Sequence, residues 1–179
     1  MIKFILLILG LFVSAYADTS NMKIENTNID QKKIIPSADT DSWILGKGTY
    51  EDFPTLIRYR PNLIKYLGMK GYTQRLVITW NYKTSEIDNG MPSNKELNDM
   101  ASFENKIISV LDPDRLAILA FVYTTNGKRE LHFYIQDIKL VSSKIDIALK
   151  DFPKLPIILS LKNDPNWNTI KIVIEGANN

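Results

Sequence analysis

The sequence predicts an α+β domain of the ferredoxin-like type, in which strands and helices follow one another in the order βαββαβ. Three observations predict it: apolar runs of strand length, two amphipathic helical segments that each lie between such runs, and an Asn-Gly pair between two β-prone segments. Two helices then cover one face of an antiparallel sheet. The opposite face must be solvated, covered by an extra N-terminal hairpin or used for binding.

The extra hairpin is predicted at the start of the folded domain, which we expect over residues 43–179. Two apolar-rich runs at its beginning are separated by Glu51-Asp52-Phe53, a connection short enough for an antiparallel pair. A loop with a helical turn is expected over 61–72. The strand at 74–82 follows, and since both of its faces carry apolar residues, we expect it at the centre of the sheet.

Two segments have the apolar spacing of helices. Ser93-Asn94-Lys95-Glu96 forms a capping-box pattern, in which the hydroxyl and the carboxylate satisfy free backbone donors at a helix start. Apolar residues then recur at three- and four-residue steps until Asp112-Pro113 ends the helix. A second helix is predicted over about 138–152, before Pro153.

The remaining strands surround the second helix. The runs 116–125 and 128–136 are joined through Asn126-Gly127, which is the strongest short-range hairpin signal. The last two strands are predicted at 156–162 and 168–174.

The N-terminus has the pattern of a secretory signal peptide over residues 1–17. Lys3 precedes the apolar run 4–13, and the small residues Ala15 and Ala17 suit a signal peptidase. The run is about half of the roughly 20 apolar residues that a membrane-spanning helix needs. We therefore expect cleavage after Ala17, export to the periplasm or outside the cell, and no transmembrane span afterwards. The polar stretch 18–42 is predicted to be a flexible leader.

The composition excludes several classes of function. The 179 residues include 22 Lys+Arg and 20 Asp+Glu, a net charge of +2, which lacks the basic excess of a nucleic-acid-binding protein. With no Cys, the chain has no disulfide, thiolate nucleophile or Cys-type zinc site. Its one His leaves little for a histidine-based metal site. We accordingly expect no cofactor and no metal.

Several segments together resemble a known family. They are WILGKGTYEDFPTLIRYR, LVITWNY, MPS, TTNGKRELHFY and LPIILSLKNDPNW, and their order and spacing are similar to those of domain of unknown function 695, DUF695, over about residues 43–170. The resemblance implies an α+β fold similar to the ferredoxin-like type. It brings no established activity.

Two carboxylates and the single histidine are the catalytic candidates. Glu104 and Asp164 could act as general acid and base on envelope material, as in a small hydrolase or transferase, if the fold brought them together. Alternatively, Glu104 is a helix-flank carboxylate paired with Arg58 or a lysine. His132 has no serine or cysteine elbow beside it, which favours an ordinary strand residue over a general base.

Aromatic and arginine side chains are the candidates for binding. Rigid aromatic rings and arginines concentrate binding energy at interfaces, although most rings in a sheet belong to the core. The candidates are Arg58, Trp80, Tyr82, Arg129, Glu130, Tyr134 and Trp167. The sequence therefore predicts an exported, non-catalytic binding or interaction module for a protein or peptide partner, of which an inhibitor of a secreted protein is one form. The extracytoplasmic hydrolase or transferase is the alternative.

Overall fold

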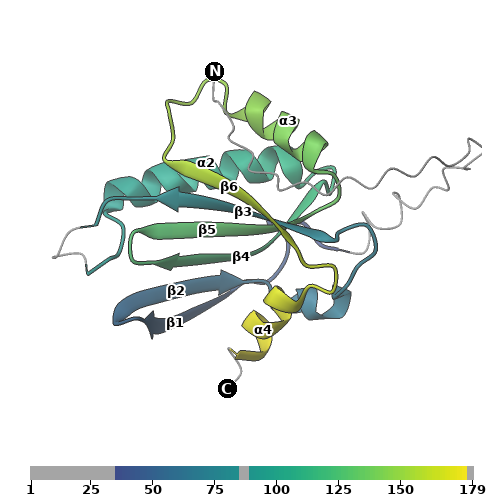
Figure 1. The fold of residues 1–179 in the computed structure, drawn as a ribbon, viewed down its shortest axis with the longest axis horizontal. Coiled ribbons are helices and arrows are strands. Elements are labelled where there is room, and N and C mark those ends of the chain that lie inside the picture. Colours follow the sequence, from purple (N-terminus) through teal and green to yellow (C-terminus); the bar gives the residue numbers. More distant parts are fainter. Residues whose placement is uncertain (1–34, 85–88, 177–179) are drawn as a thin grey trace, which may run out of the picture.

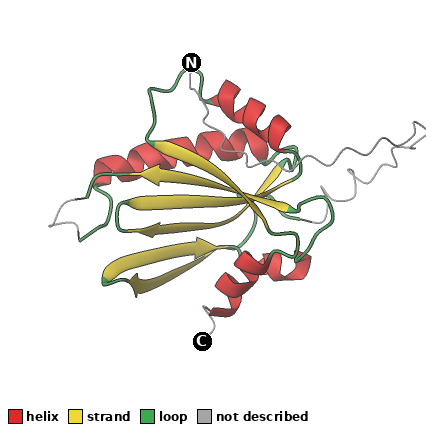
Figure 2. Ribbon diagram, viewed as in Figure 1, coloured by secondary structure: helices red, strands yellow, loops and turns green. Residues whose placement is uncertain are grey.

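A computed structural model describes residues 35–84 and 89–176 of the chain. The predicted signal peptide and residues 18–34 of the predicted leader lie outside the described residues. The described chain is α+β, with helices on both sides of one antiparallel sheet (Figures 1 and 2). The strands are β1 (Ile44–Tyr50), β2 (Phe53–Tyr59), β3 (Gln74–Asn81), β4 (Ala117–Thr125), β5 (Lys128–Ile135) and β6 (Ile157–Asn163). The helices are η1 (Pro61–Tyr66), α2 (Asn94–Leu111), α3 (Ile138–Ala148) and α4 (Asn168–Gly176).

The sheet has six strands in the order β1-β2-β4-β5-β3-β6, and every neighbouring pair is antiparallel. The elements from β3 to β6 follow the chain order β-α-β-β-α-β, which agrees with the predicted ferredoxin-like arrangement. β3 lies between β5 and β6 and is a central strand, as predicted. The predicted N-terminal hairpin extends the sheet beyond β4, so it does not cover the opposite face.

Both tight hairpins have turns of two residues with positive φ. The φ angles are 47° and 67° at Glu51 and Asp52, and 32° and 77° at Asn126 and Gly127. Two successive positive angles match the right-handed twist of the flanking strands, which is why Asn-Gly is favoured there. The predicted hairpin at Asn126-Gly127 is confirmed.

The two predicted helices pack on one face of the sheet, which we call the first face (Figure 1). The capping box of α2 is present: Ser93 Oγ accepts from the Glu96 N–H at 3.3 Å, and the Ser93 N–H donates to the Glu96 carboxylate at 3.2 Å. Met100, Phe103 and Ile107 then face the sheet and are buried. The capping residues start the helix and the apolar stripe orients it.

The prediction of a strand at 168–174 is wrong, because this segment forms α4. The Asp164 carboxylate accepts hydrogen bonds from the N–H groups of Asn168 at 2.8 Å and Thr169 at 3.2 Å, which caps the helix start. Ile170 and Ile174, four residues apart, are buried, whereas Ile172 is 69% exposed. Helical burial therefore overrides the strand preference of this β-branched segment.

The opposite side of the sheet, the second face, is covered at one end by η1 and α4. These two short helices contact each other, and Figure 1 shows them on the other side of the sheet from α2 and α3. They complete a second apolar cluster, whose largest buried members are Tyr59, Leu63, Tyr72, Tyr134 and Trp167. The sheet thus separates two cores.

Residues 35–42 lie against the domain, although the sequence assigns them to the leader. Ile35 is 2% exposed. Arg60 is fully buried, and its guanidinium donates to Asp41 Oδ2 at 2.8 Å and to the carbonyl oxygens of Pro36 at 2.7 Å and Leu119 at 3.0 Å. These contacts satisfy a buried charge, which would otherwise carry a large desolvation cost. None of the described helices is long and apolar enough to span a membrane.

Candidate functional site

Three charged side chains on the first face form what we call the Glu104 triad. Glu104 lies on α2 and is 5% exposed. Its Oε2 accepts from Arg129 Nη2 at 3.0 Å, and its Oε1 pairs with Arg58 Nη2. The predicted alternative, a helix carboxylate paired with Arg58, is confirmed as an ion pair. One carboxylate therefore serves two arginines.

The sheet register explains why these residues meet. Arg129 on β5 lies opposite Trp80 of β3 and Thr124 of β4, and Trp80 points into the first core. Directly opposed residues share a face, so Arg129 points toward α2. Arg58 on β2 points the same way, and its guanidinium carbon lies 4.6 Å from the centroid of the Trp43 ring.

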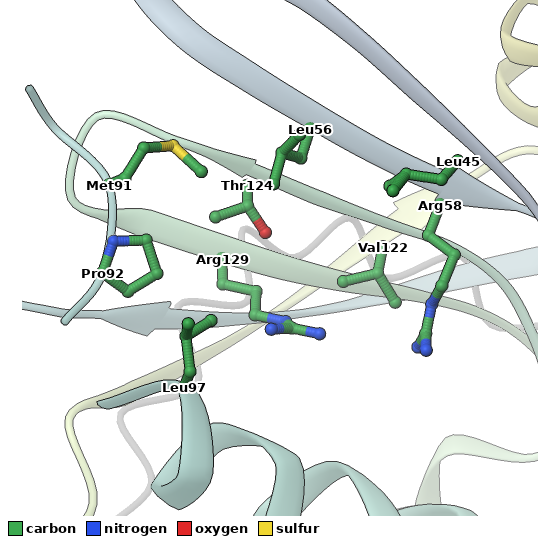
Figure 3. Close-up of a pocket in the computed structure, with 9 residues that line it drawn as sticks. All are labelled: Leu45, Leu56, Arg58, Met91, Pro92, Leu97, Val122, Thr124 and Arg129. Carbon is green, nitrogen blue, oxygen red and sulfur yellow. The ribbon is translucent and has the colours of Figure 1, made fainter. Parts of the chain in front are cut away.

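The triad adjoins a shallow depression between the β1–β2 hairpin and the start of α2, which we call the hairpin groove (Figure 3). Its cavity volume is about 110 Å³. Among the described residues that line it, two are cationic and none is anionic. Its nine residues are Leu45, Leu56, Arg58, Met91, Pro92, Leu97, Val122, Thr124 and Arg129.

The four aromatic candidates lie in the cores. Trp80, Tyr82, Tyr134 and Trp167 are 5%, 7%, 0% and 0% exposed. Trp80 packs on Phe103, with ring centroids 5.4 Å apart, and the Tyr82 hydroxyl donates to the Gly90 carbonyl at 3.0 Å. Their rings stabilise the domain and offer no open face to a partner.

A second charged cluster, which we call the Arg75 network, lies on the second face. Arg75 Nη1 is 2.5 Å from His132 Nδ1, and Arg75 Nε is 3.6 Å from Asp164 Oδ2. His132 Nε2 is 3.1 Å from Glu130 Oε2, and the Tyr134 hydroxyl donates to Asp164 Oδ2 at 2.8 Å. Here one arginine lies between two carboxylates, with the histidine linking it to Glu130.

Comparison with models of protein families assigns the chain to a family. The model of a family of unknown function, DUF695, matches residues 41–171. The chain belongs to the DUF695 family. No curated protein and no solved structure matches it significantly. Since the family carries no established activity, the function of this DUF695 protein has to be argued from its geometry.

The protonation of the Arg75 network follows from its donors. A guanidinium can only donate, so Nδ1 of His132 accepts from Arg75. The ring proton is then on Nε2, which donates a hydrogen bond to Glu130. Burial lowers the pKa of His132, and the Arg75 charge lowers it further, against the opposing effect of Glu130. The hydrogen bond from His132 in turn holds the pKa of Glu130 below its usual value, although burial opposes this shift.

Asp164 in this DUF695 protein is a structural carboxylate. Burial by itself raises its pKa, but the hydrogen bonds from Thr169, Tyr134 and the backbone N–H of Asn168 outweigh burial, and the pKa is lowered. Its ring neighbours are also packed: Tyr134 stacks on Trp167 with centroids 4.1 Å apart. Asp164 holds α4 and β5 together, because its Oδ1 accepts from Asn168 while its Oδ2 accepts from both Thr169 and Tyr134.

The two carboxylates proposed for acid–base chemistry do not converge. Glu104 faces the first core from α2, whereas Asp164 bonds Tyr134 in the second core. The backbone layer of the sheet therefore lies between them, and they cannot flank one scissile bond as a glycosidase pair must. Among the described residues, no group of three or more His, Asp or Glu side chains is placed to hold a metal ion.

Sequence reasoning missed Arg75 and the Arg60–Asp41 pair. Arg75 alternates with the buried Leu76, so the strand period already places it on the second face, and its register opposite Tyr134 completes the network. Arg60 carries no such signal, because two of its three partners, Asp41 and Pro36, come from a segment whose composition is that of a linker.

Proposed function

We propose that this DUF695 protein is an exported, non-catalytic binding module that takes a protein or peptide partner in the hairpin groove. The observation that carries the proposal is the groove itself, in which exposed apolar side chains surround two arginines that share one buried carboxylate. Apolar surface around arginine is the composition in which binding energy concentrates at interfaces.

The apolar part of the groove is accessible. Leu45 on β1 is 58% exposed and Leu97 on α2 is 39% exposed, and both line the groove. Figure 3 shows them on opposite walls, with Arg129 between. Covering such side chains removes apolar surface from water at about 25 cal/mol per Å². This supports a contact surface.

The size and lining of the groove argue against a reaction chamber. Ligand pockets are commonly about 300–1,000 Å³, whereas this cavity is about 110 Å³. The carboxylate of Glu104, which contacts both arginines of the groove, already accepts from two guanidinium groups. Catalysis by paired carboxylates would need a second one nearby, and Asp164 lies across the sheet. These observations support binding over hydrolysis.

The exported location rests on the sequence pattern of residues 1–17. Cell fractionation followed by N-terminal sequencing of the accumulated protein tests it. We expect the protein outside the cytoplasm, with Asp18 as its first residue. An intact chain beginning at Met1 in the cytosol would contradict export.

Site-specific cross-linking tests the binding role. A photoreactive amino acid at Leu45, in the groove, is expected to give a discrete adduct in intact cells. The matched control is the same amino acid at Ile158, which is 60% exposed on β6, at the other edge of the sheet. The Leu45 adduct should disappear when Leu97→Asp places a charge in the opposite wall of the groove. Equal adducts at both positions, or none at Leu45, would contradict the proposal.

A further inference from the structure

The charges of the hairpin groove are unbalanced. Arg58 and Arg129 both line it, and among the described residues the carboxylate that contacts them is that of Glu104. Lys47 lies opposite Leu56 in the β1–β2 pairing, so it shares the groove side of the hairpin and adds a further positive charge there. Counted over the part of the chain that the structure describes, the groove therefore has an excess of positive charge beside its apolar walls.

Both arginines keep donors to spare. Each uses one terminal nitrogen for Glu104, and a guanidinium has five N–H donors in a planar fork. Within residues 35–84 and 89–176, the Nε of each arginine also has no hydrogen-bond acceptor, but it is buried, so a ligand meets the terminal nitrogens. The Arg58 side chain is 38% exposed, so a ligand can reach it. A second carboxylate would accept charge-assisted hydrogen bonds from the terminal donors that Glu104 does not use.

Apolar residues lie on both sides of Arg129. In Figure 3, Met91, Pro92 and Leu97 lie to one side of Arg129, and Val122 and Leu45 lie to the other. A ligand that fills the groove therefore places apolar groups before and after its acidic group. That arrangement fits an internal acidic side chain of a peptide better than a chain end.

The shape of the groove favours an extended peptide. Its lining comes from four neighbouring strands, β1, β2, β4 and β5, and from the start of α2, so a ligand in the groove lies across these strands on the first face. An extended segment presents several side chains to such a surface, and its apolar side chains can meet the leucines while an acidic one meets the arginines.

From these observations we infer that the hairpin groove recognises an extended peptide segment in which one Glu or Asp side chain is flanked by apolar residues, the carboxylate entering between Arg58 and Arg129. The inference rests on the proposed binding role and deepens it by naming the ligand chemistry. The shallow cavity accepts the acidic side chain, and the apolar walls of the groove contact its neighbours.

Three peptide libraries test the chemistry. They are octapeptides with blocked ends and identical random positions, differing only in a fixed central residue: Glu, Gln or Lys. The full chain is immobilised and the retained peptide is quantified by mass spectrometry. We expect the Glu library to be retained about tenfold more than the Gln library, as for one charge-assisted contact of about 1.4 kcal/mol, and the Lys library least. The preference should weaken at high salt.

Two variants of the triad should move the preference in opposite directions. Arg58→Gln removes the excess charge of the triad and should abolish the preference for Glu over Gln, while Arg58→Lys should keep part of it. Glu104→Gln removes the competing carboxylate at nearly constant shape and should increase the preference. A variant that merely misfolds cannot bind more tightly, so this gain distinguishes recognition from damage. Lys162→Gln, on β6, is the control for loss of one positive charge elsewhere.

The outcomes separate this inference from the proposed function. Equal retention of the Glu and Gln libraries, both lost on Leu97→Asp, would overturn the acidic specificity and leave the groove a binding site. Retention of no library would overturn the peptide inference, and the cross-linking experiment would then judge the groove by itself. A Glu preference that survives Arg58→Gln would also overturn it, because another cation would be responsible.

Discussion

The two faces of the sheet use the same residue types in opposite proportions. On the first face, two arginines share the one carboxylate of Glu104, and the cluster opens into a groove. On the second face, one arginine serves Asp164 and, through His132, Glu130, beneath rings and short helices. The cluster on the second face is covered and its groups hydrogen-bond one another, which indicates a structural role. The cluster on the first face has an excess of donors beside exposed apolar walls, which suits a ligand, so exposure and the sign of the excess charge separate the two where residue type does not.

The largest effect is expected from Trp167→Ala, which removes the centre of the second core. The ring stacks on Tyr134, contacts Tyr72 edge-on, and donates from Nε1 to the Tyr72 carbonyl at 2.8 Å. Truncation of a buried Trp costs about 3–5 kcal/mol of unfolding free energy. Urea unfolding checks it. Ile172→Ala, on the exposed side of α4, should change stability by less than about 0.5 kcal/mol.

Next in size is Glu104→Leu, which leaves both arginines of the triad without their carboxylate. Breaking a buried ion pair from one side costs about 3 kcal/mol, and the partial exposure of Arg58 keeps the loss at that lower end. Glu104→Gln retains an acceptor and should cost less. Equal stability of the wild type and Glu104→Leu in chemical unfolding would show that the triad does not stabilise the fold. The first face would then differ even more clearly from the structural cluster on the second face.

The Arg75 network should make stability depend on pH. The pKa of His132 is lowered in the folded state from its usual 6.5, so below about pH 6.5 the unfolded chain takes up a proton that the folded chain does not. Stability is then complete above pH 6.5 and falls as the pH drops below it, by at most about 1.4 kcal/mol per pH unit, until the folded pKa is reached.

The other charged groups near His132 do not change stability in the same pH range. Arg75 and Glu130 contact His132, Asp164 lies beyond Arg75, and both carboxylates have lowered pKa values, so their contributions are lost only in more acidic solution. Denaturant unfolding of the untagged protein between pH 8 and pH 5 measures the effect. His132→Gln removes the only histidine of the chain and should flatten the profile in that window. A flat wild-type profile would contradict the prediction.

The smallest effects on stability are expected at exposed apolar residues of the two edges. Leu45→Ser and Ile158→Ser replace side chains that are 58% and 60% exposed, and each should alter the unfolding free energy by less than about 0.5 kcal/mol. Their effects on binding should differ. Leu45→Ser should reduce retention of the Glu library and Ile158→Ser should not, and a reduction by both would remove the distinction between the edges.

Most of the fold was predictable because local signals agree with tertiary burial. Ser93 and Glu96 mark the start of α2, and Asn126-Gly127 marks the β4–β5 turn, each by its own hydrogen bonds or backbone angles. The segment 168–174 was predicted wrongly because its β-branched residues favour a strand. In the structure, the capping hydrogen bonds to Asp164 and the burial of Ile170 and Ile174 stabilise a helix instead.

The candidate site was predictable residue by residue more than as a unit. Arg58, Glu104 and Arg129 stand out as polar residues within apolar segments, and the pairing of Glu104 with Arg58 follows. That Asp164 lies on the other side of the sheet depends on the path of the chain after β6, which no local pattern records. The participation of Met91 and Pro92 in the groove depends in the same way on tertiary packing.

The burial of Arg60 determines where the chain can be shortened. The family match begins at residue 41, yet the Arg60 guanidinium also donates to the Pro36 carbonyl, and Ile35 is buried in the second apolar cluster. A fragment that begins at residue 41 would retain Asp41. It would lack the Pro36 carbonyl, which accepts from the buried Arg60, and it would expose the apolar surface that Ile35 covers. Expression of the isolated domain should therefore start upstream of Ile35, and family limits drawn from sequence similarity would understate the folding unit.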